Sequence, residues 1–205
     1  MFFPVFWAIM SANWMGSKAS FVLIPMEAEG QQNHLKAYGI TYWALDKNYK
    51  VNWLLNYRGG SFLFPDTEEI RKECQIRGVS FEIVADVKYN GILAEIAQAD
   101  VNQDIVKLEK SPRIAVYSPK NKQPWDDAVT LAMTFAEIPY TIVYDEEILR
   151  GDLKDYDWLH LHHEDFTGQY GKFWYNYKNA SWFKEYVRFN ENLASKLGFS
   201  IPKLR

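Results

Sequence analysis

The sequence predicts an α/β protein with three layers and a mostly parallel sheet. Apolar runs of strand length alternate along the chain with segments in which apolar residues recur at helical spacing. The first run, residues 21–26, is apolar throughout, which is typical of a parallel strand covered on both faces. These two observations favour a core built from βαβ units.

The first half is expected to extend from residue 20 to residue 110 and to begin with a strand–helix–strand unit. A helix is predicted over 32–47 because Leu35, Tyr38, Tyr42 and Leu45 form one stripe. The next strand, 51–57, would pair in parallel with the first through a right-handed crossover. The other elements expected here are a short apolar run at 62–64, a helix starting at 65–69, a strand at 81–85, a helix at 90–99 and a short strand at 104–108.

The second half is predicted to extend over 111–205, since Ser111-Pro112 punctuates the chain. Its expected strands are 113–117, 140–144 and 156–161, and its expected helices are 125–136, 145–149 and 180–196. Three strands alone would leave an unpaired sheet edge. We therefore expect further βα units after Arg205, so that the chain is the N-terminal part of a longer protein.

Composition limits the class of function. The chain has 205 residues, of which 48% are hydrophobic, and a net charge of −3 without any long basic run, so no nucleic-acid surface is predicted. Aromatic residues make up 17% of the chain, enough for a well-filled core or for an aromatic groove that binds a sugar or peptide. The single cysteine, Cys74, lies in an amphipathic helical pattern and is interpreted as a structural thiol.

The N-terminus resembles a secretory signal. Residues 2–10 form an apolar run too short to span a bilayer, and Ser17 and Ala19 provide a small-x-small cleavage pattern. We expect a signal peptide over 1–19, an exported protein of the periplasm or cell envelope, and no membrane span in the mature chain. The alternative is a buried or partner-binding N-terminal segment.

The segment 158–172 is the strongest candidate for a functional site. Three of the four histidines lie here: one near the end of a predicted strand and two just after it, followed by two acids, at the sheet edge where open α/β sheets bind ligands. The residues are His160, His162, His163, Glu164 and Asp165. A Gly-containing loop comes next, and it includes Thr167, Gly168, Gln169 and Lys172. Three interpretations remain open: a metal site, a metal-free ligand or catalytic loop with a histidine as general base, and a structural cluster. We favour the metal-free loop and predict no metal or cofactor.

Two further segments are weaker candidates. Arg58, Gly59 and Gly60 follow a strand and would let the backbone approach an anion, or they form a tight turn. Trp125, Asp126 and Asp127 open a helix, where the acids match the helix dipole and could also line the pocket of the histidine segment. His34, near the start of the first helix, is interpreted as a surface or capping residue.

Four segments together resemble an exported family from Bacteroidetes-type bacteria that is often labelled asparagine synthetase B. They are residues 33–39 (NHLKAYG), 52–62 (NWLLNYRGGSF), 123–129 (QPWDDAV) and 157–172 (DWLHLHHEDFTGQYGK). From Arg113 onward the layout also looks like the class I glutamine amidotransferase-like fold, a flavodoxin-like sheet. The resemblance covers most of residues 20–200.

The resemblance implies acyl transfer or amide hydrolysis, with His160, His162, His163 and Glu164 shaping the pocket. Thr167 to Gly171 would then offer backbone N–H groups to an oxyanion or carboxylate. The nucleophilic cysteine of such a fold would lie beyond residue 205. True asparagine synthetase B begins with a catalytic Cys and has an SGGxDS pyrophosphate loop, whereas this chain has Phe2 and no such loop, so ATP-dependent asparagine synthesis is not predicted.

Two alternatives to this enzyme remain. One is a non-catalytic envelope module that binds a sugar or peptide through its aromatic residues and the histidine loop. The other is a metal-dependent hydrolase that uses residues 160–165. The expected partner is a small-molecule, peptide or glycan ligand, and the oligomeric state is left open.

Overall fold

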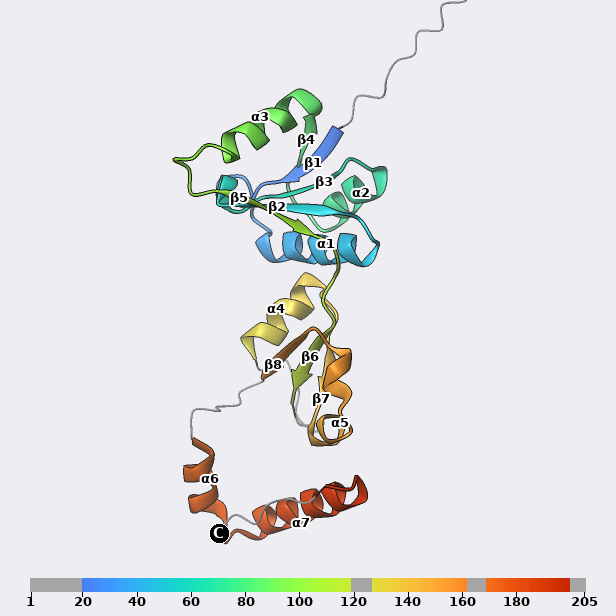
Figure 1. Cartoon of the computed structure of the whole chain (residues 1–205), viewed down its shortest axis with the longest axis vertical. Helices are drawn as coiled ribbons and strands as arrows, with labels where there is room; N and C mark the ends of the chain where they lie inside the picture. The colour runs from blue at the N-terminus through green and yellow to red at the C-terminus, as the bar shows by residue number, and fades with distance from the viewer. Residues whose placement is uncertain (1–19, 119–126, 162–168, 200–205) are drawn as a thin grey trace, which may run out of the picture.

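A computed structural model describes residues 20–118, 127–161 and 169–199, which form two sheets (Figure 1). The first sheet has the strand order β4-β1-β3-β2-β5 and the second has the order β7-β6-β8. The strands are β1 (Ser20–Ile24), β2 (Val51–Leu55), β3 (Phe62–Pro65), β4 (Glu82–Ala85), β5 (Asp104–Leu108), β6 (Ile114–Tyr117), β7 (Thr141–Val143) and β8 (Trp158–Leu161). The helices are α1 (His34–Asp46), α2 (Glu68–Ile76), α3 (Asp86–Ile96), α4 (Ala128–Ala136), α5 (Asp145–Leu149), α6 (Gln169–Tyr177) and α7 (Ser181–Lys196).

The five-stranded sheet is antiparallel at every pairing, so the predicted mostly parallel, flavodoxin-like three-layer sheet is wrong. Strands β1 and β2, which α1 connects along the chain, do run in the same direction. In the sheet, however, β3 lies between them. The order β1-α1-β2-β3-α2-β4 is the split βαβ arrangement of ferredoxin-like sheets. The protein is therefore an α/β protein whose larger sheet is antiparallel and whose smaller sheet is parallel.

A tight turn between β2 and β3 causes this difference. Asn56, Arg58, Gly59 and Gly60 all have left-handed backbone angles, with φ of 58°, 45°, 78° and 92°. A Cβ atom at Gly59 would lie 2.5 Å from the carbonyl of Met26, so only glycine fits there. The turn sends the chain straight back along β2, and the run 62–64 becomes the central strand of the sheet.

Helices cover both faces of the five-stranded sheet. Val22, Ile24 and Phe64 belong to the core cluster beneath α1 and α2, whereas Leu23 and Leu63 belong to the cluster beneath α3. Alternate residues of β1 and β3 thus point to opposite faces, and both sets are buried. This two-sided burial explains why β3 and all of β1 after Ser20 are apolar, since the usual alternation of apolar and polar residues appears only when one face meets water.

The three-stranded sheet is parallel, with β6 in the middle. Helix α4 connects β6 to β7 on one side, and α5 with the short 3-10 helix η3 (Asp152–Asp155) connects β7 to β8 on the other. The side chain of Asp127 caps α4 by accepting hydrogen bonds from the backbone N–H groups of Val129 and Thr130. The three strands predicted for this half, and their parallel pairing, are present in the structure.

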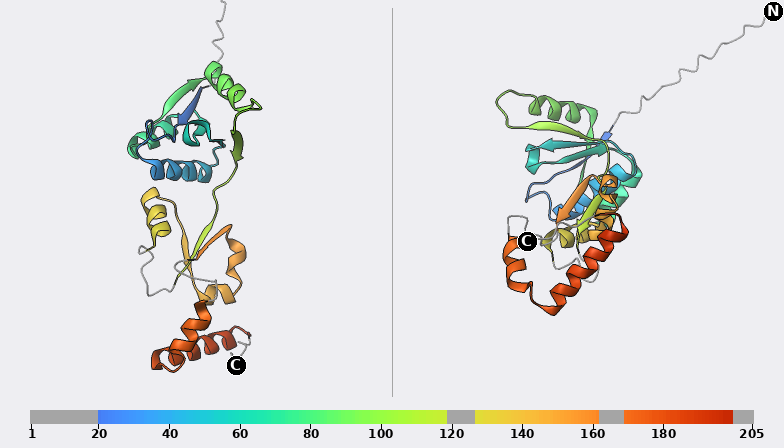
Figure 2. Two further views of the ribbon diagram at one scale, coloured as in Figure 1. Left: turned by 90° about the vertical axis from the view of Figure 1, so that its left-hand side faces the viewer. Right: turned by 60° about the horizontal axis from the view of Figure 1, so that its bottom comes forward.

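Helices α1 and α4 pack against each other and hold the two sheets together, and the left view of Figure 2 shows α4 facing α1. Lys36 donates a hydrogen bond of 2.6 Å to Glu137, just after α4. Gly39 has no side chain at the point where α1 approaches α4 most closely, and a Cβ there would overlap the carbonyl oxygen of Ala136. The crossing of the two helices thus depends on this glycine.

Helices α6 and α7 form a pair joined by an aromatic cluster. The ring of Phe173 on α6 contacts those of Trp182 and Phe183 on α7, with centroids 6.1 and 5.9 Å apart. Residues 169–172 were expected in a Gly-containing loop, but the structure has them in the first turn of α6. None of the helices in the described ranges is long and apolar enough to cross a membrane.

Candidate functional site

The candidate site lies at the carboxyl ends of β6 and β8. The chain leaves β6 toward one neighbour through α4 and later returns to its other neighbour, β8, so the direction of winding changes at β6. Open α/β sheets hold ligands in the crevice that forms at such a point. On one face of the sheet, three polar side chains of the described residues come to this edge: His160 on β8, Asp127 at the start of α4, and Ser118 directly after β6.

His160 is hydrogen-bonded to Asp127. Its Nε2 atom lies 3.2 Å from Oδ1 of Asp127, and the two side chains are only 17% and 10% exposed. His160 pairs with Val116 across the sheet, on the face that packs against Met133 of α4, which brings the imidazole to the helix start. Asp127 is thus both the cap of α4 and the partner of His160.

The protonation state of this pair follows from its hydrogen bonds. Burial alone would raise the pKa of Asp127, but donation from Thr130 N–H, His160 and Val129 N–H outweighs it and lowers the pKa below its usual value. Asp127 is therefore ionised at neutral pH and can only accept hydrogen bonds. Nε2 of His160 must carry the proton that it donates, which leaves the lone pair of the neutral ring on Nδ1.

Ser118 is a polar residue that sequence reasoning missed. It is fully buried, and its Oγ atom has no hydrogen-bond partner among the residues that the structure describes. It follows Val116 by two residues and its N–H bonds the carbonyl of Val143, so it extends β6 on the face that carries His160. Its position at the carboxyl end of a central strand was the signal that could have revealed it.

A second polar cluster lies at the same end of β6, on the opposite face. Tyr117 donates a 2.6 Å hydrogen bond to Asp145, and its ring stacks on that of Tyr144. Burial, helped by Asp145, raises the pKa of Tyr117 far above its usual value, so the phenol stays protonated. The Tyr186 hydroxyl of α7 lies 3.1 Å from that of Tyr144, which ties α7 to this edge of the sheet.

Most of the predicted site residues lie outside the described part of the chain. They are His162, His163, Glu164, Asp165, Thr167, Gly168, Trp125 and Asp126. Of the others, Gln169 and Lys172 belong to α6, where Lys172 is exposed. The structure brings together His160 and Asp127, one residue from each of the two segments that we expected to line a common pocket.

Arg58, Gly59 and Gly60 form the tight turn on the five-stranded sheet, away from the sheet that carries His160. The Arg58 guanidinium bonds Glu27, with its Nε atom 2.8 Å from Oε1, and its Nη1 atom donates to Glu82 at 2.8 Å. The guanidinium of Arg58, which we expected to lie beside a bound anion, is thus hydrogen-bonded to two carboxylates of the protein itself. These bonds, with that to Glu27 foremost, raise the pKa of Arg58 further.

His34 and Cys74, two residues of types that often take part in catalysis, have structural roles here. His34 lies with Nε2 3.0 Å from the carbonyl oxygen of Met26 at the start of α1. Cys74 is fully buried in α2, and burial raises the pKa of its thiol to about 12, so it stays protonated and unreactive at neutral pH.

Within the described ranges, no three His, Cys, Asp or Glu side chains are grouped so that they could hold a metal ion. The histidines and acids at 162–165 fall outside those ranges, so the metal-site interpretation of that segment remains open. Comparisons with protein-family models, with curated proteins and with solved structures found no match for the chain.

Proposed function

We propose that the protein transfers protons at the carboxyl edge of the parallel sheet during hydrolysis or acyl transfer of a small amide or ester. His160 is the general base in this proposal, and Asp127 orients it. The observation that carries the proposal is the hydrogen bond between Nε2 of His160 and Oδ1 of Asp127, in a part-buried setting at the end of β6.

The geometry supports this role in a simple way. A buried carboxylate bonded to one imidazole nitrogen fixes the ring and its tautomer and stabilises the imidazolium that forms when the other nitrogen takes a proton. Here Nδ1 would take a proton from water while the water oxygen attacks the carbonyl carbon of the substrate. The proton would then pass to the departing nitrogen or oxygen as the acyl bond breaks.

The choice of an amide rests on the resemblance to the exported family labelled asparagine synthetase B, not on the fold, because the larger sheet is antiparallel. Ser118 adds a hydroxyl on the same face of the sheet as the proposed base, two residues after Val116, the β6 residue that pairs with His160. Such a hydroxyl could donate a hydrogen bond to the substrate carbonyl.

Ammonia release from L-glutamine and L-asparagine by the whole chain tests the proposal. His160→Gln should lower the rate at least about a hundredfold, the usual contribution of a general base. Asp127→Asn should lower it as well but leave the helix intact, because Asn caps helices as well as Asp does. His34→Gln, the matched control at the start of α1, should keep its rate within about twofold.

Hydrolysis that is equal in all four proteins, or absent from the wild type with amide and ester substrates alike, would overturn the proposal. A second candidate, ligand binding without turnover, is favoured by the buried Ser118 hydroxyl. Within the described ranges this hydroxyl has no hydrogen-bond partner, and a ligand could supply one. A sugar or peptide that raises the melting temperature of the wild type but not of Ser118→Ala, without being consumed, would select this candidate.

A further inference from the structure

A hollow of ≈ 350 Å³ lies at the opposite end of the parallel sheet, beside the amino ends of β6 and β7. Its walls include the rings of Tyr42 on α1, Tyr140 and Tyr156, and its charged groups are Arg113 and Asp155. The volume lies in the range of small-molecule sites. We propose that this hollow binds a free α-amino acid with an apolar or aromatic side chain.

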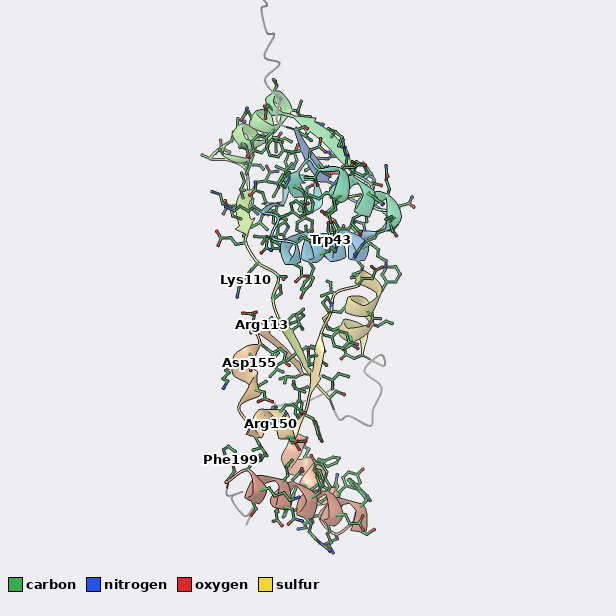
Figure 3. All side chains as sticks on the ribbon, turned by 90° about the vertical axis from the view of Figure 1, so that its right-hand side faces the viewer. Trp43, Lys110, Arg113, Arg150, Asp155 and Phe199 are labelled. Carbon is green, nitrogen blue, oxygen red and sulfur yellow. The ribbon has the colours of Figure 1, made fainter. Side chains whose placement is uncertain are left out.

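The two charged groups keep hydrogen-bonding capacity for a ligand. Arg113 uses Nε for a long bond of 3.4 Å to Asp157, and neither of its Nη atoms donates to a described residue. Asp155 forms no hydrogen bond or ion pair within the described ranges, and the two residues are not paired with each other. Figure 3 labels both and shows them on the same side of the second sheet.

Asp157 keeps Arg113 in place and is itself fully engaged. Its Oδ2 atom accepts a 2.9 Å hydrogen bond from the backbone N–H of Arg113, and its Oδ1 atom accepts one of 2.8 Å from Lys110. These bonds, first that from the Arg113 backbone, hold the pKa of Asp157 well below its usual value. Asp157 therefore serves as an anchor for Arg113, and Asp155 remains as the carboxylate that can meet a ligand.

An amino acid matches this arrangement at three points. A carboxylate can take two parallel hydrogen bonds from the Nη atoms of Arg113, and an ammonium group can donate to Asp155. Tyrosine rings pack against an apolar side chain and attract a cation over their faces. A neutral sugar would use the rings but would leave both charges without a counterpart, which is why we favour the zwitterion.

The hollow also joins the two halves of the molecule. Tyr42 comes from α1, and its hydroxyl donates a 3.0 Å hydrogen bond to the carbonyl oxygen of Pro112 in the connection between the sheets. The other lining residues belong to the second half. A bound amino acid would therefore stabilise the packing of the two halves, independently of the function proposed for His160.

Calorimetric titration of the whole chain with L-phenylalanine tests the proposal. Saturable binding is expected, and both 3-phenylpropionate, which lacks the ammonium group, and phenethylamine, which lacks the carboxylate, should bind at least about tenfold more weakly. Arg113→Gln and Asp155→Asn should each weaken L-phenylalanine binding by a similar factor. Asp152→Asn, a matched change on the same short helix, and His160→Gln should leave it within about twofold.

Three results would overturn the proposal. One is no binding of L-phenylalanine up to about 10 mM, which is weaker than small-molecule sites of this kind require. Another is equal binding of the two analogues that lack one charge. The third is binding of N-acetylglucosamine in place of the amino acid, which would assign the hollow to a sugar. Melting curves of each variant without ligand show whether it is folded.

Discussion

Replacement of Gly39 by alanine tests the packing of the two halves, because its expected effect has the opposite sign to the usual one. In a helix interior, Gly→Ala ordinarily stabilises a protein by about 0.5–1 kcal/mol. At Gly39, however, the new methyl group would overlap the backbone carbonyl of Ala136 on α4. A backbone atom cannot rotate away as a flexible side chain can, so α1 and α4 must separate.

The magnitude follows from two opposing effects. Overpacking costs about 1–3 kcal/mol, and an overlap with a backbone atom belongs in the upper part of this range, about 2–3 kcal/mol. The gain in helix propensity offsets about 1 kcal/mol of it, which leaves a net loss of about 1–2 kcal/mol. Separation also weakens the Lys36–Glu137 pair, which contributes little because Glu137 is half exposed. For a chain of this size, the loss lowers the melting temperature by about 2–8 °C.

Gly91 in α3 provides the matched control. It also lies inside a helix, but no atom lies within 4 Å of the position that its Cβ would take. Gly91→Ala should therefore stabilise the protein by about 0.5–1 kcal/mol. Urea unfolding followed by tryptophan fluorescence measures both variants. If Gly39→Ala is as stable as Gly91→Ala, or more stable than the wild type, the close contact of α1 with α4 does not exist.

Three other substitutions test separate parts of the structure. Thr67→Ala should cost about 1 kcal/mol, because the Thr67 hydroxyl caps α2 at the N–H of Ile70, and Thr67→Ser should cost much less; equal losses in urea unfolding would argue against the cap. The Cys74 thiol, whose pKa burial raises to about 12, stabilises the fold below its unfolded pKa and loses this contribution as pH rises. The stability advantage of the wild type over Cys74→Ala should hence shrink by about 2 kcal/mol between pH 8 and 10.5, and a constant difference would contradict the burial. Ser118→Ala should raise the free energy of unfolding by about 1 kcal/mol because it removes a buried hydroxyl that has no hydrogen-bond partner among the described residues. A loss of stability would show that the hydroxyl does have a partner.

The positions of most strands and helices could be predicted from the sequence, but their pairing in the first half could not. The continuous apolar character of residues 21–26 indicated burial on both faces, which is correct for β1, but it carries no information on strand direction. The direction was set by the tight turn at 56–60, four of whose residues have left-handed backbone angles. Asn56 and Arg58 are not glycines, so their positive φ values left little signal in the sequence.

Helix α6 was missed for a different reason. Gly168 and Gly171 suggested a loop, whereas the helix is stabilised by tertiary contacts of Phe173 and Tyr177 with Trp182 on α7. In the site, the position of His160 at a strand end could be predicted from the polar residues that follow it. Its pairing with Asp127 could not, because the two residues are 33 positions apart and meet only through the packing of α4 on the sheet.

The tautomer of His160 tests the proposed site most directly. A long-range ¹H–¹⁵N spectrum of the protein, labelled on the histidine rings, distinguishes a proton on Nε2 from one on Nδ1. The neutral His160 ring should carry its proton on Nε2, and Asp127→Asn should disturb this preference without any change at His34. A proton on Nδ1 in the wild type, or a spectrum that Asp127→Asn leaves unchanged, would contradict the role of Asp127 and the general base that depends on it.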